Sequence, residues 1–241
     1  MYRVQIGFNN DDLWANTTKS VAKVYDIPAN VETIKYSYDG TKENEKDWTV
    51  LYKDETAKTV EILSPEAMGS LDLGVKDTEV QGSNDWEKAV YSYNHAIERL
   101  NNYASSLITN PNKISVRSVG SNPSNSNYRN TTKYTSDKLE SWSCSLKGTP
   151  VTVNGVAEVG ENNYEQDLVR MSALGVASIE NNYWLASRCG AVSTSNTVYF
   201  SVACVDGGVA TESSLFYAYS EGYVDFNTGE RAIRPIVKIN Y

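Results

Sequence analysis

The sequence predicts a folded protein that combines helices with short β-strands. Segments 85–107 and 164–174 repeat their apolar residues at helical spacing, whereas most other apolar residues fall in short β-like runs. Hydrophobic residues make up 40% of the 241 residues and charged residues 22%, which is typical of a folded soluble protein and too apolar for general disorder. A chain of this length can bury a substantial core in one or two domains.

The charge balance bears on the class of partner. The net charge is -8 and the pI is about 4.8, so we expect no nucleic acid as a partner, because an acidic surface repels phosphates. No apolar run approaches the roughly 18 residues of a membrane span, which predicts no membrane insertion. Residues 1–12 contain no apolar stretch of the secretory type, and we therefore expect no signal peptide.

The N-terminal residues mix β-like runs at 2–8 and 31–38 with turn-forming clusters. The polar run GTKENEKD at 40–47 is typical of a boundary or of a long hairpin loop. We interpret residues 1–45 as an extension that attaches or assembles the protein, and 46–241 as the main domain. Within that domain, Trp48, Val50 and Tyr52 alternate and a second β-like run follows at 59–63, which predicts a β-hairpin.

The longest predicted helix spans 85–107. Asn84 can cap its first turn, Glu87 can reach back to the cap, and the Asn-Pro-Asn sequence at 110–112 ends it. One face carries the apolar residues Trp86, Val90, Tyr93, Ile97, Leu100, Ala104 and Leu107. A β-like run at 114–120, an exposed loop at 121–132 and an irregular stretch at 133–160 are expected to follow.

A second predicted helix spans 164–174, with Tyr164, Leu168 and Met171 on one face. Gly175 is expected to end it in the left-handed conformation that glycine adopts without strain. Only short β-like runs follow this helix in the sequence.

Several short motifs follow one another along the chain: NYEQD at 163–167, MxxLG at 171–175, YWLASR at 183–188, FxV at 200–202 and IRPIV at 233–237, preceded by Trp48, ILS at 62–64 and RSVGS at 117–121. These motifs resemble those of a C-type-lectin-like domain family from Gram-positive gut bacteria and their phages. The resemblance covers roughly 48–240. It implies an α+β fold of the C-type-lectin-like type, with two helices packed on small twisted antiparallel sheets and a short β-rich N-terminal extension.

The same resemblance implies that 46–241 is a ligand-binding domain. It also implies a relation to the variable proteins of diversity-generating retroelements and to the formylglycine-generating-enzyme branch of the fold. Such domains display sequence-variable residues on an exposed face near the C-terminus. A fold does not by itself define a function, so each site must be argued from its own residues.

The C-terminal residues, 181–241, divide into predicted core and predicted binding surface. Alternate side chains of a strand share one face, so small polar and aromatic residues between apolar positions should point outward. Tyrosine supplies contact area at low entropy cost, while serine and asparagine supply adaptable hydrogen bonds. The predicted core residues are Trp184, Leu185, Phe200, Val202, Val205, Leu215, Ile233, Pro235 and Val237. The candidate ligand-binding residues are Ser193, Ser195, Asn196, Tyr199, Ser201, Ala203, Asp206, Thr211, Glu212, Phe216, Ala218, Ser220, Tyr223, Asp225 and Asn227, with an ordinary solvated face as the alternative.

Residues that carry catalysis or bind metals are sparse. The single histidine, His95, falls about half a turn from the apolar face of its helix and is expected to be solvent-exposed. Cys189 and Cys204 either face each other across a hairpin or are small buried hydrophobes. The segment DFNTGE at 225–230 could offer three oxygen ligands to calcium or form a tight turn, and the sugar-binding calcium triplets of C-type lectins do not occur. We predict no catalytic residue, no metal and no cofactor.

Two arginines, Arg188 and Arg234, adjoin the apolar motifs and are expected to hydrogen-bond loop carbonyls or carboxylates. Together these patterns predict a non-enzymatic binding or adhesion protein. We expect a component of a phage virion, at the tail or the capsid surface, that recognises a glycan or protein on a bacterial cell and assembles with other virion subunits, including copies of itself. The alternatives are a structural decoration or assembly protein of a virion, and a bacterial surface or extracellular protein exported without a signal peptide. A glycosidase with a carboxylate dyad has the least support.

Overall fold

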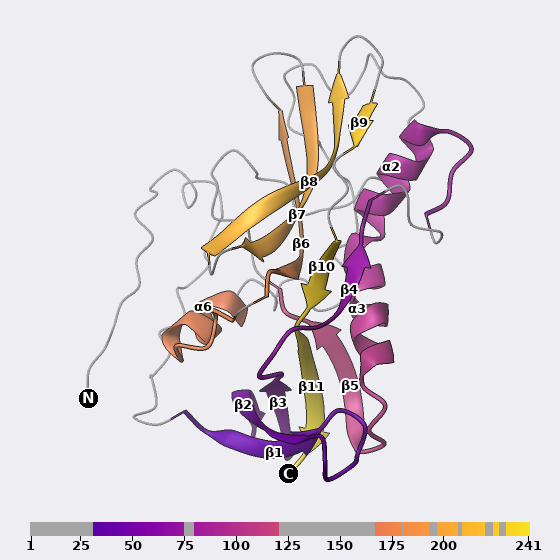
Figure 1. Ribbon diagram of the computed structural model, residues 1–241. Coiled ribbons are helices and arrows are strands. Elements are labelled where there is room, and N and C mark those ends of the chain that lie inside the picture. The colour runs from indigo at the N-terminus through magenta and orange to yellow at the C-terminus, as the bar shows by residue number, and fades with distance from the viewer. Residues whose placement is uncertain are drawn as a thin grey trace.

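The computed structural model shows an α+β protein with two mostly antiparallel sheets (Figure 1). It describes residues 31–74, 80–120, 167–179, 181–192, 197–206, 209–219, 224–226 and 230–241. In the view of Figure 1 the six-stranded sheet lies above the five-stranded sheet, α2 (Asp85–Asn94) and α3 (Ala96–Leu107) run along one side of both, and α6 (Asp167–Ala173) lies on the other side. None of the described helices is long and apolar enough to cross a membrane.

The five-stranded sheet is antiparallel throughout. In spatial order its strands are β1 (Thr33–Ser37), β2 (Glu45–Asp54), β3 (Thr59–Leu63), β11 (Pro235–Asn240) and β5 (Lys113–Ser118). The pairing of β2 with β3 confirms the predicted hairpin. A register shift between Val50 and Tyr52 interrupts the simple alternation, and Leu51 is therefore buried as well.

The first described strand, β1, comes from the range that the sequence assigns to an extension. It pairs with β2, and the ring of Tyr36 packs edge-on against Trp48 with 5.1 Å between centroids. Residues 33–37 are therefore part of the sheet. The predicted run at 2–8 lies outside the described residues.

The turn after β1 depends on the carboxylate of Asp39. It accepts hydrogen bonds from the hydroxyl of Ser37, the backbone N–H and hydroxyl of Thr41 and the side-chain amide of Asn44. Because these bonds favour the charged form, led by the bond from Ser37, they hold the pKa of Asp39 well below its usual value.

Replacing Asp39 with alanine should lower the melting temperature at neutral pH, and this difference should shrink as the pH falls below about 4. The pKa of Asp39 is lower in the folded than in the unfolded chain. Its stabilising contribution is therefore complete above the unfolded-state pKa and is lost as acid protonates the folded carboxylate. Melting curves of both proteins between neutral and acidic pH test this expectation, and a difference that stays constant with pH would contradict it.

The six-stranded sheet contains β4 (Met68–Asp72), β10 (Glu230–Ile233), β6 (Tyr183–Val192), β7 (Thr197–Asp206), β8 (Val209–Tyr219) and β9 (Val224–Phe226), in that spatial order. Only the β10–β6 pair is parallel. β10 is followed directly by Arg234 and then by β11, so the chain passes from one sheet to the other at this arginine. Arg234 is thereby placed at the junction of the two sheets.

The long predicted helix is present but is interrupted at His95, which separates α2 (Asp85–Asn94) from α3 (Ala96–Leu107). The predicted cap is confirmed, because the side chain of Asn84 accepts from the N–H of Glu87 at 3.0 Å. The expected exposure of His95 is wrong: its side chain is 23% exposed. Its ring stacks on Tyr91 at 4.2 Å and its Nδ1 lies 3.0 Å from Glu98.

The second helix, α6 (Asp167–Ala173), begins within the predicted range, and residues 164–166 lie outside the described residues. It ends at Gly175 as predicted, with φ of 71°. The N–H of Gly175 donates to the carbonyl of Ser172, and the N–H of Val176 donates to that of Met171. This pair of bonds is a Schellman motif, which requires the left-handed conformation at its glycine.

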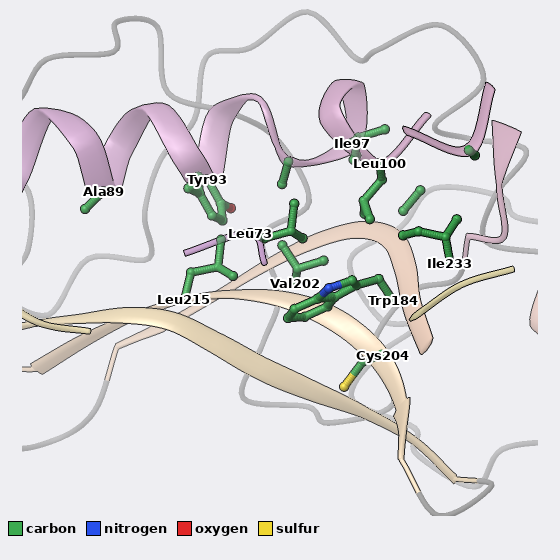
Figure 2. Packing of buried hydrophobic residues seen from close by; sticks show 13 residues of the cluster. Leu73, Ala89, Tyr93, Ile97, Leu100, Trp184, Val202, Cys204, Leu215 and Ile233 are labelled. Atoms are coloured by element: carbon green, nitrogen blue, oxygen red, sulfur yellow. The ribbon is translucent and has the colours of Figure 1, made fainter. Parts of the chain in front are cut away.

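The main core lies between helices α2 and α3 and the six-stranded sheet (Figure 2). Tyr93 and Leu100 project from the helices toward Val202 and Trp184 of the sheet, and Ile97 belongs to the same buried cluster. The structure confirms as buried the predicted core residues Trp184, Leu185, Val202, Val205, Leu215, Ile233, Pro235 and Val237. The side chain of Phe200 lies outside the described set.

Candidate functional site

The three longest adjacent strands, β6, β7 and β8, contain 10, 10 and 11 residues and carry most of the candidate binding residues. We call these three strands the β6–β8 ribbon. In Figure 1 the ribbon extends from the middle of the molecule toward the end opposite the five-stranded sheet. One face of the ribbon is committed to the core, since Val202, Cys204 and Leu215 are buried beneath α2 and α3 (Figure 2).

The opposite face is also buried at the β10 side of the ribbon. There Tyr183, Leu185 and Val205 belong to a second core cluster that includes Met171 of α6 and Leu63 of β3. Both faces of the ribbon are therefore anchored where it joins the rest of the protein. Strand alternation makes Tyr199, Ser201 and Ala203 the positions opposite to the helix-facing Val202 and Cys204, as the sequence predicts.

The strand register brings two candidate segments to the same end of the ribbon. Thr197 lies opposite Tyr219, and Ala218 lies opposite both Val198 and Val224. The connections at 193–196 and 220–223 therefore start from neighbouring strands at the same end of the ribbon. The candidates Ser193, Ser195, Asn196, Ser220, Tyr223 and Asn227 themselves lie outside the described residues.

Other candidates occupy known strand positions. Tyr199 lies opposite Tyr217, Ser201 opposite Ser214 and Ala203 opposite Glu212. Phe216 lies between Phe200 and Phe226, and Tyr217 between Tyr199 and Asp225. Their side chains fall outside the described set, so their exposure stays a prediction.

The remaining candidates lie at the far end of the ribbon. Asp206 is opposite Val209, and Thr211 is opposite Cys204. Thr197 and Asp206 are nine residues apart on one strand, which corresponds to about 30 Å. The candidate residues therefore extend along the ribbon but do not share one face. Directly opposed residues of an antiparallel pair lie on the same face, so the positions Phe216, Ala218 and Thr211 fall on the face of Cys204, opposite to Tyr199. Glu212 and Asp225 fall on the face of Tyr199, and we call these positions, together with Ser201 and Ala203, the strip. Asp206 has structural partners as well, because it accepts from Asn182 at 2.8 Å and lies 3.7 Å from Arg231.

Buried arginines fix the base of the ribbon, as the sequence predicts for Arg188 and Arg234. Arg188, on β6, is fully buried and donates to the carbonyl of Asn94 at the end of α2. Its guanidinium also lies 5.9 Å from the ring centre of Tyr93. This contact ties β6 to the point where the helix is interrupted.

Arg234 makes contacts on the other side of the sheet that correspond to those of Arg188. It donates to the carbonyls of Ser64, Val176 and Ala177, and its guanidinium lies 5.7 Å from the ring centre of Tyr183. Burial lowers the pKa of this guanidinium, and Tyr183 opposes that shift. The ribbon, the segment after α6 and the segment after β3 are thus held together by one side chain.

A buried ionic network escaped the sequence analysis. Asp167, at the start of α6, is completely buried and pairs with both terminal nitrogens of Arg117 on β5. It also accepts from the hydroxyl of Tyr52 at 2.9 Å and from the N–H of Gly120 at 3.0 Å, while Arg117 reaches Glu61 at 2.7 Å. Asp167 and Arg117 belong to two motifs of the lectin-like resemblance, and that membership was the available signal for their proximity.

The suggestion that Cys189 and Cys204 face each other across a hairpin is wrong. The register places Cys189 opposite Ser201 and Cys204 opposite Trp184. The two positions are offset because β6 contains extra residues between Trp184 and Arg188, where Ala186 donates to the carbonyl of Val119. Cys204 is a small buried residue of the core.

Within the described part of the chain, no group of three or more histidine, cysteine, aspartate or glutamate side chains is placed to hold a metal ion. Comparison with protein-family models, with curated proteins and with solved structures gives no match. The C-type-lectin-like resemblance therefore depends on the sequence motifs alone.

Proposed function

We propose that this protein is a non-enzymatic binding protein with a C-type-lectin-like fold, and that the β6–β8 ribbon carries its contact surface. One observation supports the proposal most directly: a ribbon anchored on both faces at its base brings the 193–196 and 220–223 connections to the same end. Contact residues on rigid strands are positioned more accurately than residues on isolated loops. The tyrosine, serine and asparagine content of these segments suits a surface for macromolecular recognition.

The partner that fits this strip is a large one. Positions spread over several adjacent strands match a protein surface or a chain of several sugars better than a single small metabolite. We propose a glycan or protein on the surface of a bacterial cell as the target. The proposed location is a phage virion, in which further copies of the chain and other subunits would present several ribbons together and raise the avidity of weak individual contacts.

Binding by the purified full chain to a panel of intact Gram-positive gut bacteria, measured by flow cytometry, tests this function. Surface polysaccharide and surface protein released from the same cells would serve as separate competitors. Competition by either class supports recognition of that class. Absence of binding to every strain, or turnover of the polysaccharide by the pure protein, would overturn the proposal.

Replacing Tyr199 and Tyr223 with alanine should weaken binding by about 30-fold or more for each tyrosine that acts as an anchor, because tyrosine is a frequent hot-spot residue. The melting temperature should stay nearly unchanged if both side chains face outward. Binding isotherms on cells and thermal melts provide the two measurements.

A matched control is Tyr241→Ala, which removes a 47%-exposed tyrosine from the end of the five-stranded sheet. This variant should bind as well as the unaltered protein. A large fall in melting temperature for the Tyr199 and Tyr223 variants would show that these residues belong to the core and that the strip is misassigned.

A further inference from the structure

The carboxylates of the five-stranded sheet have lysine partners close by. With the exception of Lys88 on α2, every lysine of the described residues lies on a strand of this sheet or in a turn between its strands. Four of these lysines form ion pairs at separations of 2.5–3.5 Å: Lys35 with Asp47, Lys46 with Glu66, Lys53 with Glu32 and Lys58 with Glu55. Negative charge in this part of the molecule is therefore compensated locally.

The β6–β8 ribbon has a different charge composition. Between Arg188 and Arg231 the sequence contains no lysine, arginine or histidine, and it contains five carboxylates: Asp206, Glu212, Glu221, Asp225 and Glu230. This stretch alone accounts for five of the eight net negative charges of the chain. The ribbon therefore supplies no cation of its own to these carboxylates beyond its first strand.

The two arginines that flank this stretch are held by structural contacts. Arg188 is fully buried and donates to the carbonyl of Asn94. The guanidinium of Arg231 lies 4.8 Å from the ring centre of Trp184 and 3.7 Å from Asp206, and its side chain is only 18% exposed. Arg231 thus compensates Asp206 at the base of the ribbon.

The strand register places two of the other carboxylates on the strip. Glu212 lies opposite Ala203, and Asp225 lies opposite Tyr217, which in turn lies opposite Tyr199. Opposed residues share a face, so both acidic positions fall beside the tyrosine positions of the same face. A surface with charge of one sign attracts partners of the opposite sign and repels partners of its own sign.

We propose that the strip recognises a basic protein surface, whose lysine and arginine side chains pair with Glu212 and Asp225. This inference rests on the proposed function of the ribbon and narrows the class of its partner. Lysine and arginine donate charge-assisted hydrogen bonds to carboxylates. The combination of tyrosine and serine on adjacent strands resembles the composition of surfaces that bind proteins. Cell-surface polymers rich in phosphate or carboxylate are disfavoured, because like charges would face each other.

Binding of the full chain to intact cells of a recognised strain, measured by flow cytometry at several salt concentrations, tests the charge of the partner. Raising NaCl from about 0.05 to 0.5 M should weaken binding roughly tenfold or more, because salt screens the attraction. At low salt, Glu212→Gln/Asp225→Asn should weaken binding by about tenfold and reduce this salt dependence. The matched control, Asp47→Asn/Glu66→Gln, removes the same kinds of charge from the five-stranded sheet and should bind as the unaltered protein does.

Treatment of the cells tests the partner without any variant. Acetylation of surface amines, which removes the positive charge of lysine, should abolish binding, and so should digestion of surface protein by a protease. Binding that survives the protease but not the acetylation would show that an amine-bearing glycan is the partner and that the protein assignment is wrong.

The outcomes separate this inference from the proposed function. If cells are bound and Tyr199→Ala reduces binding, but binding depends neither on salt nor on Glu212 and Asp225, the ribbon is a contact surface and the charge inference is overturned. If no strain is bound at all, the proposed function fails and this inference fails with it.

Discussion

Replacing Arg117 with alanine should lower the free energy of unfolding by about 3–5 kcal/mol, since it leaves the carboxylate of Asp167 buried without its cation. Among the donors in the described residues, Asp167 would retain those of Tyr52 and Gly120. Burial already raises the pKa of Asp167, and Arg117 is the main group that opposes this shift. Removing the arginine should therefore raise this pKa further.

The pH dependence of the Arg117 variant follows from the same shift. A carboxyl whose pKa is higher in the folded than in the unfolded chain favours folding when it is protonated, so its penalty grows as the pH rises through that range. The deficit of Arg117→Ala should thus be smaller at about pH 4 than at pH 7. Urea unfolding of both proteins at these two pH values measures the effect.

The exposed pair Lys35–Asp47 provides the matched control. Its separation of 2.8 Å is comparable, yet its side chains are 61% and 55% exposed, so Lys35→Ala should lower the free energy of unfolding far less than Arg117→Ala. A double variant, Arg117→Met with Asp167→Leu, should be less destabilised than the sum of its parts, because it removes the charges together. If Arg117→Ala proves no worse than Lys35→Ala, the network does not stabilise the fold.

Local patterns explain which parts of this fold the sequence predicts. The hairpin around β2 and β3, the start of α2 and the ends of α3 and α6 depend on neighbouring residues, such as Asn84 at a cap and Gly175 at a helix end. The interruption at His95 has no such local cause, because the apolar spacing continues through it. Instead, Arg188, 93 residues further on, donates to the carbonyl of Asn94. Sequence periodicity contains no information about such a distant donor.

The ionic network shows the same limit. Asp167 lies in a helix of seven residues and looks like an ordinary acidic residue of a first turn. Its burial follows from Arg117, 50 residues away, and from Tyr52 on another strand. For Arg188 and Arg234, by contrast, the flanking apolar motifs require burial, and a buried guanidinium must find acceptors. The sequence therefore predicts that these arginines bond to carbonyl groups, but it does not predict which carbonyls these are.

Replacing Arg234 with alanine should lower the free energy of unfolding by at least about 3 kcal/mol, because three carbonyls lose their donor where the two sheets meet. Arg234→Lys should recover little of this loss, since one ammonium cannot reproduce the planar fork that serves Ser64 on one side and Val176 and Ala177 on the other. Urea unfolding of both variants measures the loss.

Arg170→Ala is the matched control for this substitution. Arg170 is half-buried and donates to the carbonyl of Leu51, so its removal should cost less than the removal of the fully buried Arg234. Hydrogen exchange would locate the damage caused by Arg234→Ala. Because Val176 and Ala177 follow α6 directly, the amides of α6 should exchange faster, whereas those of the β2–β3 hairpin should change less. A uniform acceleration across both regions would mean that Arg234 stabilises the whole molecule and does not specifically hold α6 against the sheets.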